Sequence, residues 1–267
     1  MSDFRIYGES VPDLVPDNEG SPKLLRESRR FAASAGAAWI GQAWGLFTRR
    51  WGVWVGMSFV MLLITTVVSM LPLVGFLSNF LTLFFAGGMM LAAAALAEND
   101  DLEFVYLFGG FQHKFKELLI LTLLYFLVLL LVVFVFVVVM YLTGTNISDW
   151  DSAQPSVAAM AMYGWIILAG FAALVPVSMM MWFATVLTVL DDVTPWQAMK
   201  MSFQGCVRNI LPFIVYGLVW LGLSLVVGLL AMGLVMLFDW VWLPPVVMSA
   251  LMILVVTPWT MLTGYTT

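Results

Sequence analysis

The sequence is poor in charge and in the side chains on which most enzymatic chemistry depends. Asp, Glu, Lys and Arg together make up 10% of it, and it has one histidine and one cysteine. A single cysteine excludes an internal disulfide and a cysteine-based metal cluster. His113 has no second histidine to complete a zinc site, so we interpret it as solvated or facing lipid headgroups. The chain also lacks a Walker-type nucleotide loop, a zinc-protease motif and a nucleophile-base pair. We therefore expect no enzyme activity, no catalytic residues, no cofactor and no metal site.

Long apolar runs dominate what is present. Hydrophobic residues make up 63% of the chain and the mean hydropathy is +1.01, values far from those of a soluble domain. No charged residue falls inside a long apolar run. A run of about 20 apolar residues is typical of a membrane-spanning helix, because only a helix satisfies its own backbone in lipid. We predict an all-α polytopic membrane protein with six transmembrane helices, over about residues 52–70, 73–97, 118–142, 161–190, 213–237 and 244–264.

The eleven Lys and Arg residues recur at every second connection between the apolar runs. Seven precede the first run, two follow the second and two follow the fourth: Arg5, Lys23, Arg26, Arg29, Arg30, Arg49, Arg50, Lys114, Lys116, Lys200 and Arg208. Cytoplasmic connections retain Lys and Arg during insertion, so this alternation predicts a multi-pass protein of the bacterial inner membrane with both termini in the cytoplasm. The net charge of -5 comes partly from the acidic N-terminal stretch and says nothing of nucleic acid, and we expect no nucleic-acid partner.

The N-terminal segment differs in composition from everything after it. Residues 1–22 carry Pro12, Pro16 and Pro22 among acidic and small polar residues. Such a segment cannot bury enough apolar surface to fold alone. We expect a flexible acidic arm over residues 1–22, followed by a single six-helix transmembrane domain over residues 23–267.

Three segments on the cytoplasmic side have apolar residues at helical spacing with polar groups between them. They run from Leu24 to Phe47, from Glu98 to Glu117, and from the helix cap Thr194 to Ile210. Their apolar faces are formed by Phe31, Ala35, Trp39, Ala43 and Phe47, then Phe104, Leu107, Phe108, Phe111 and Phe115, then Trp196, Met199, Phe203, Cys206 and Ile210. We predict three amphipathic helices on the inner membrane surface, each followed by a helical hairpin.

The resulting layout is an internal repeat with three copies, each made of one surface helix followed by one helical hairpin. In two of the units a Phe-Gln pair is followed by a basic residue at the same distance. These are Phe111-Gln112 with Lys116, and Phe203-Gln204 with Arg208.

The most polar intramembrane grouping lies in the first two spans. It consists of Asn79, Ser78, Thr82 and Thr65. These side chains could line an intramembrane path for a substrate, or they could be ordinary helix contacts. Gly87 and Gly88, with the alanines that follow, are interpreted as a close approach of helices. The sequence does not decide between a substrate path and ordinary helix contacts for these four residues.

Basic and proline residues add two further expectations. Six basic residues either bind anionic lipid headgroups or serve topology alone: Arg49, Arg50, Lys114, Lys116, Lys200 and Arg208. Pro176 removes a backbone donor from the fourth span and is expected to kink it. Broken helices at Pro176 and Pro258 would be compatible with a substrate site that needs no charge.

Several short stretches carry a resemblance to a known family. They are Trp44-Gly45-Leu46-Phe47, Leu71-Pro72-Leu73-Val74-Gly75, Leu107-Phe108-Gly109-Gly110-Phe111, the stretch from Pro176 to Phe183, and Ser202-Phe203 through Cys206, Arg208 and Asn209. From about Ala38 onward the chain resembles the BPSS1780-type family of uncharacterised multi-pass membrane proteins of proteobacteria. The resemblance implies an inner-membrane protein with six helices and no assigned activity. The acidic arm lies outside it.

These observations favour a non-enzymatic inner-membrane accessory or scaffold protein. We expect it to pack against membrane lipids and a membrane-protein partner, or against a second copy of itself. The alternative is a passive or lipid-handling transporter that uses the polar group around Asn79 and the Pro176 kink. A further alternative is a metal exporter built on methionine clusters such as Met179-Met180-Met181, although methionines of this kind are also typical of ordinary packing.

Overall fold

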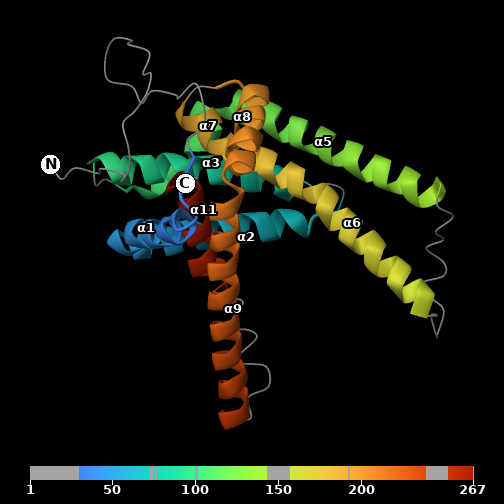
Figure 1. Ribbon diagram of the computed structural model, residues 1–267. Helices are drawn as coiled ribbons and strands as arrows, with labels where there is room; N and C mark the ends of the chain where they lie inside the picture. Colours follow the sequence, from blue (N-terminus) through green and yellow to red (C-terminus); the bar gives the residue numbers. More distant parts are fainter. Residues whose placement is uncertain are drawn as a thin grey trace.

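A computed structural model of the chain describes residues 30–72, 75, 77–99, 102–142, 157–191, 193–238 and 252–266. Helices make up nearly all of these residues, and no strand occurs among them (Figure 1). In chain order they are α1 (Ala35–Arg49), α2 (Trp51–Ser69), α3 (Leu77–Asn99), the 3-10 helix η1 (Phe104–Phe108), α4 (Gly109–His113), α5 (Phe115–Leu142), α6 (Val157–Trp182), α7 (Ala184–Leu190), α8 (Pro195–Arg208), α9 (Ile210–Phe238), the π-helix η3 (Met252–Val256) and α11 (Thr257–Thr266). The predicted all-α class is confirmed.

Five helical segments of the described chain are long and apolar enough to cross a membrane. They are Trp51–Ser69, Leu77–Glu98, Phe115–Leu142, Met160–Leu190 and Ile210–Leu230. Each corresponds to one of the first five predicted spans. The predicted sixth span, 244–264, falls partly on residues 239–251, which lie outside the described chain. The count of six therefore stays a prediction.

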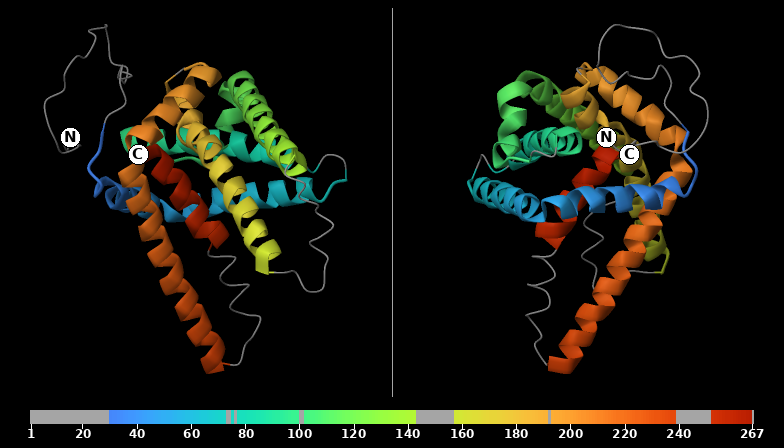
Figure 2. Two further views of the ribbon diagram at one scale, coloured as in Figure 1. Left: turned by 45° about the vertical axis from the view of Figure 1, so that its right-hand side comes forward. Right: turned by 90° about the vertical axis from the view of Figure 1, so that its left-hand side faces the viewer.

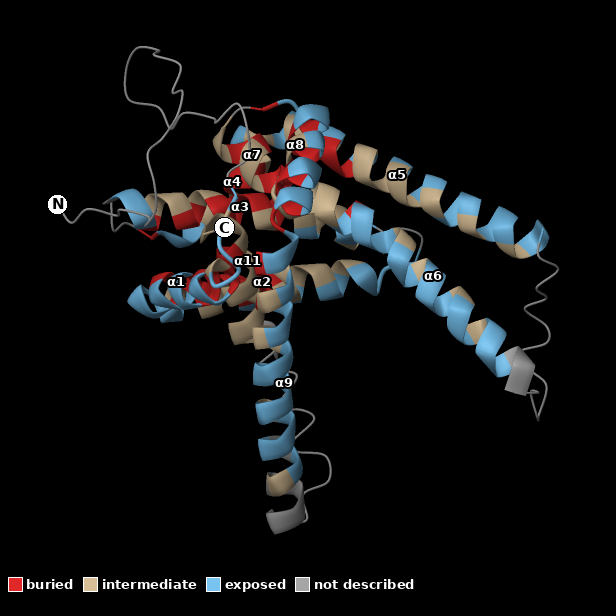
Figure 3. Cartoon of the chain, viewed as in Figure 1, coloured by how far each residue is buried: buried red, intermediate tan, exposed pale blue. Residues whose placement is uncertain are grey.

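The helices form a packed core from which three of them project. In Figure 1, α9 extends away from the core in one direction and α5 with α6 in another. Buried residues gather where α1, α3, α7, α8 and α11 meet, while the far parts of α5, α6 and α9 are exposed (Figure 3). In the span of α3, half of the most apolar window is buried, against none in α5 and 6% in α9. The core is thus built around α3.

Small residues allow α3 to approach its neighbours closely. Ala92 and Ala93 are fully buried, and a Cβ atom added to Gly88 would collide with the backbone carbonyl oxygens of Tyr106 and Leu107 in η1. The interpretation of this region as a close helix approach is confirmed. On one side of α3 a cluster of Trp54, Met57, Phe85, Met89 and Leu107 is buried; on the other side lie Phe84, Leu118, Leu121, Ala198 and Met199.

The segments that connect the hairpins pack in a cyclic order. Each lies against the second helix of the hairpin that precedes it: η1 and α4 contact α3, and α8 contacts α6 and α7. The first such helix, α1, contacts α11 at the other end of the chain, together with α9 (Figure 2). The order of packing therefore closes on itself, because the first helix takes the place after the last hairpin.

The predicted surface segments form helices with different bounds and orientations. The first begins at Ala35, whereas residues 1–29, with the predicted acidic arm, lie outside the described chain. Its predicted apolar stripe faces protein, since Trp39, Ala43 and Phe47 are buried where α1 packs against α9 and α11. The second segment is divided into η1 and α4 because its Gly109-Gly110 pair fits against α3. Placement of these helices at a membrane surface stays a prediction.

In α8 the face that packs against the core coincides only in part with the predicted apolar face. The residues facing the core are Pro195, Ala198, Met199, Ser202, Gly205 and Cys206. Of the predicted stripe, Met199 and Cys206 are buried, but Trp196 is 57% and Phe203 37% exposed. The reason is steric: small residues let α8 lie close to α6, so the bulky aromatic side chains are turned away from the core.

The fourth span is interrupted at a residue that the sequence analysis did not single out, and the kink expected at Pro176 stays a prediction. Helix α6 continues through Pro176 to Trp182, and the interruption lies at Phe183, before α7 begins. Pro258, by contrast, is the second residue of α11 and directly follows the change from π-helix to α-helix.

Replacing Gly88 by alanine tests the close approach of α3 and η1. We expect a loss of about 1–3 kcal/mol in stability, because the added methyl group meets backbone carbonyls that cannot move aside. The matched control is Gly222→Ala in α9, where nothing lies within 4 Å of the added atom and alanine is the better helix former. Thermal unfolding of the detergent-purified protein measures both, and equal midpoints for the two variants would contradict the packing described here.

Candidate functional site

A serine side chain bridges the interruption between α6 and α7. In an unbroken helix the N–H of Phe183 would donate to the carbonyl of Met179, four residues earlier. Here it donates to Oγ of Ser202 on α8, at 2.9 Å. The Ser202 hydroxyl in turn donates to the Met179 carbonyl oxygen, at 2.7 Å. We name Met179, Phe183, Ser202 and Cys206 the α6–α8 joint. The joint thereby provides partners for the Phe183 N–H and the Met179 carbonyl, as burial within a membrane protein requires.

Cys206 belongs to the same joint, one helical turn after Ser202. Its Sγ lies 3.5 Å from the Met179 carbonyl oxygen, to which the thiol donates. The side chain is 2% exposed, and burial raises the pKa of this thiol to about 12 despite the neighbouring Ser202 hydroxyl, which lowers it. Because the thiolate is the nucleophile and metal ligand, this cysteine serves the joint as a protonated donor.

The joint was not found by sequence reasoning. Ser202 was noted only as part of a resemblance and Cys206 as the single cysteine and a member of an apolar helix face, while only a kink at Pro176 was expected in the fourth span. One signal was present: Ser202, Gly205 and Cys206 are small residues three and four positions apart, which is the spacing of one helix face. What the spacing could not indicate is that the serine would lie against the carbonyl of Met179.

A second set of hydrogen bonds joins the two ends of the described chain. The indole N–H of Trp259 donates to the carbonyl of Ile40 at 3.0 Å, and the hydroxyl of Thr266 donates to the carbonyl of Trp39 at 3.2 Å. Asn209 adds a third link, since its Oδ1 accepts from the N–H of Phe31 at 2.8 Å. Each bond connects residues far apart in sequence, so these contacts hold the cyclic order of packing together.

Aromatic rings from α1, α6 and α9 lie in contact beside these bonds. The ring centroid of Phe213 is 5.5 Å from that of Trp39 and 5.3 Å from that of Trp182. Trp182 also meets Tyr216 edge to face, at 5.5 Å. The indole N–H of Trp182 is buried and has no hydrogen-bond partner. An unpaired buried donor destabilises the arrangement that contains it, so the position of Trp182 costs free energy in this structure.

The structure places the predicted polar path on α2 and α3. The hydroxyl of Thr65 donates to the Met61 carbonyl at 2.8 Å, and that of Thr82 donates to the Ser78 carbonyl at 2.9 Å. Both bonds lie within a single helix, the usual arrangement for hydroxyl side chains in apolar helices. Asn79 and Thr82 are exposed. Whether these four residues line a path stays a prediction.

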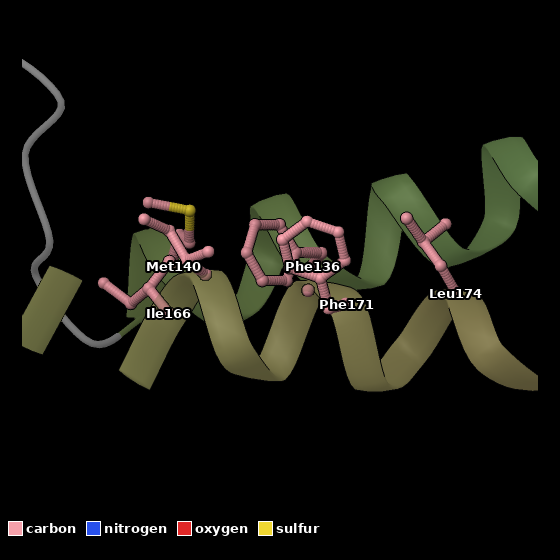
Figure 4. A pocket seen from close by; sticks show the side chains of 7 residues that line it. Phe136, Met140, Ile166, Phe171 and Leu174 are labelled. Carbon is pink, nitrogen blue, oxygen red and sulfur yellow. The ribbon is translucent and has the colours of Figure 1, made fainter. Parts of the chain in front are cut away.

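An apolar groove lies between the projecting helices α5 and α6 (Figure 4). Two adjoining hollows of about 370 and 960 Å³ are lined by apolar and aromatic side chains, among them Phe136, Met140, Ile166 and Phe171. None of the four polar-path residues takes part in either hollow. The groove suits an apolar occupant.

The six predicted headgroup residues stand in three pairs. Each pair lies on or directly after a connecting helix: Arg49 and Arg50 after α1, Lys114 and Lys116 after α4, Lys200 and Arg208 on α8. All are exposed except Lys114, which is half-buried. Within the described chain there is no group of three or more His, Cys, Asp or Glu residues placed to hold a metal ion. Headgroup binding by the three pairs stays a prediction.

Cysteine labelling tests the burial of the α6–α8 joint. A pKa of about 12 instead of 9.0 lowers the thiolate fraction at pH 8 by roughly three orders of magnitude, so we expect native Cys206 to resist a maleimide reagent. Labelling should become complete once the protein is unfolded in SDS. The control is Gln204→Cys in a Cys206→Ala background, which places a thiol on the exposed face of α8. Equal labelling rates in the two folded proteins would contradict the buried joint.

Comparison with known proteins gives one partial similarity. Over 50 residues the chain is 52% identical to a probable inner membrane protein of Burkholderia thailandensis. The aligned stretch covers 19% of this chain and 18% of that relative. No protein-family model matches the chain, and no solved structure gives a significant match. The chain is an all-helical membrane protein that is similar, over about a fifth of its length, to a protein described as a probable inner membrane protein.

Proposed function

We propose that the protein is a non-enzymatic accessory or scaffold protein of the bacterial inner membrane, with both termini in the cytoplasm. The observation that carries this proposal is the set of apolar helices that the chain's own fold leaves uncovered. No residue in the most apolar window of α5 is buried, and only 6% of the corresponding windows in Met160–Leu190 and Ile210–Leu230. Such surfaces are available to lipid and to the helices of other membrane proteins.

Helix α9 has the surface that a partner helix requires. Gly217, Ser224 and Gly228 are exposed, and successive members differ by seven and four positions, which places them on one face. Among the residues that the structure describes, nothing lies within 4 Å of a Cβ atom added to either glycine. Helices associate in membranes through small residues, because these let two backbones approach closely. The face of α9 formed by Gly217, Ser224 and Gly228 therefore suits close contact with a helix from a partner protein or from a second copy.

The lipid part of the proposal is supported by α8. Its outward face carries Trp196, Lys200, Phe203 and Val207, all exposed, with Arg208 at its end, and the helix contains no acidic residue. Aromatic rings and cations on one face are typical of helices that lie at an anionic membrane surface. The pairs after α1 and α4 repeat the same charge at equivalent places in the other two units.

A lipid-handling transporter is the second candidate. It is favoured by the apolar groove between α5 and α6, which has the lining that an acyl chain requires, together with the interruption of the fourth span at Phe183. Interrupted helices occur in transporters, where they allow parts of a span to move separately. This candidate differs from the first in what accompanies the purified protein: lipid alone, rather than a protein partner.

Native mass spectrometry of the protein extracted in mild detergent tests the proposal. We expect a stoichiometric membrane-protein partner or a second copy, and we expect Gly228→Leu to reduce the associated fraction at least tenfold, because the bulky side chain prevents close contact. Gly222→Leu is the matched control: the same substitution in the same helix, at an open position on a different face. A protein that is always monomeric and carries only lipid would overturn the scaffold proposal and favour the transporter.

A further inference from the structure

The interruption at Phe183 has no local cause in the sequence. Neither Gly nor Pro occurs in the stretch 177–193. Sharp breaks in helices arise at such residues or where a side chain enters the ladder of backbone hydrogen bonds. Here the entering side chain is Ser202, which accepts from the N–H of Phe183 and donates to the carbonyl of Met179. A tertiary contact from α8 therefore keeps the fourth span divided into α6 and α7.

The backbone at the interruption is close to helical. Phe183 has φ -100° and ψ -11°, against about -63° and -42° in a regular α-helix. Rotations of roughly 40° and 30° at this one residue would therefore carry α6 into α7 without a break. The interruption thus differs from a continuous helix by a small change at one residue. Closing it would move the whole of α6 relative to α7, because every residue before Phe183 moves with the rotation.

Closing the break would exchange one set of hydrogen bonds for an equivalent one. The N–H of Phe183 would pass from Ser202 Oγ to the Met179 carbonyl, its ordinary partner in a helix. The released Ser202 hydroxyl could then donate to a carbonyl of its own helix, four residues back, as serines in helices do. Both states satisfy the same donors and acceptors, so hydrogen bonding alone does not strongly favour either.

The side chain of Trp182 destabilises the interrupted arrangement of α6 and α7. It directly precedes Phe183, and its buried indole N–H has no hydrogen-bond partner. Its ring meets Phe213 and Tyr216 of α9 edge to face. A rotation at Phe183 changes how the turn that carries Trp182 lies against these rings. The unpaired donor is the kind of unfavourable group expected at a site that adopts two arrangements.

From these observations we propose that Phe183 is a hinge in the fourth span and that the Ser202 hydroxyl is the latch that holds it open. In the latched state α6 and α7 are separate helices; in the released state they form one helix, and α6 changes its direction relative to α8 and the core. α6 packs mainly against α5 and α8, and its outer part is exposed, so a rotation at Phe183 would carry this outer part like a lever. The hinge goes beyond the proposed function, since a scaffold or a transporter could use it.

Distance measurements between spin labels test the hinge in the full-length protein reconstituted in lipid vesicles. The labels are attached at Leu168→Cys on the exposed side of α6 and at Gln204→Cys on α8, in a Cys206→Ala background. We expect a major distance for the latched state and a minor second distance for the released state. Adding Ser202→Ala removes the latch and should make the second distance the major one.

The matched control is Ser178→Ala, which removes a hydroxyl from α6 that bonds only to its own helix, at the Val175 carbonyl. It should leave the distances unchanged. The hinge is overturned if Ser202→Ala gives the same distances as its parent, or if both variants shift them equally. If Ser202→Ala does not fold, the parent protein decides: a single narrow distance, unaltered by temperature, overturns the proposal, and two exchanging distances support it.

Discussion

The close approach of α3 to the helices around it is the constraint on which the rest of the structure depends. Gly88 admits the backbone of η1, and the same helix contacts α2, α5, α7 and α11. In a bilayer no hydrophobic force drives helices together, so contact of this kind must come from packing at short range. With α3 at the centre, the two buried clusters form on its opposite sides, and the remaining helices are placed by what they contact there.

The cyclic packing has a further consequence for how the chain is held together. The connecting segments lie against the hairpins that precede them, and α1 completes the circle by contacting α11. Trp259 and Thr266 bond to backbone carbonyls of α1, so the last described helix is tied to the first. These bonds use backbone carbonyls of α1 as acceptors and add to the packing of its buried side chains against α11. The core is thus closed while the far parts of α5, α6 and α9 remain outside it, available to lipid or partners.

Sequence patterns predicted much of this architecture and missed its joints. Apolar runs predicted the first five spans because a helix in lipid must be apolar over its whole length, whatever its neighbours. Glycines 87 and 88 predicted a close contact, since only glycine leaves room for a backbone. The interruption at Phe183 was not predicted, because a missing donor such as that of Pro176 is visible in a sequence and an inserted hydroxyl from α8 is not. The core-facing side of α8 was not predicted for a related reason: hydrophobic character marked Trp196 and Phe203, which are exposed, while steric fit placed Ser202 and Gly205 against the core.

Taken by itself, the sequence determined the helical class, the positions of the long apolar segments and the scarcity of chemistry-bearing side chains. These follow from composition and period, which each segment carries independently of the others. Tertiary structure decided which helices cover one another, where the fourth span opens, and why Cys206 is a protonated donor rather than a reactive thiol. Each of these depends on two segments meeting at short distance, and no property of either segment alone specifies that meeting.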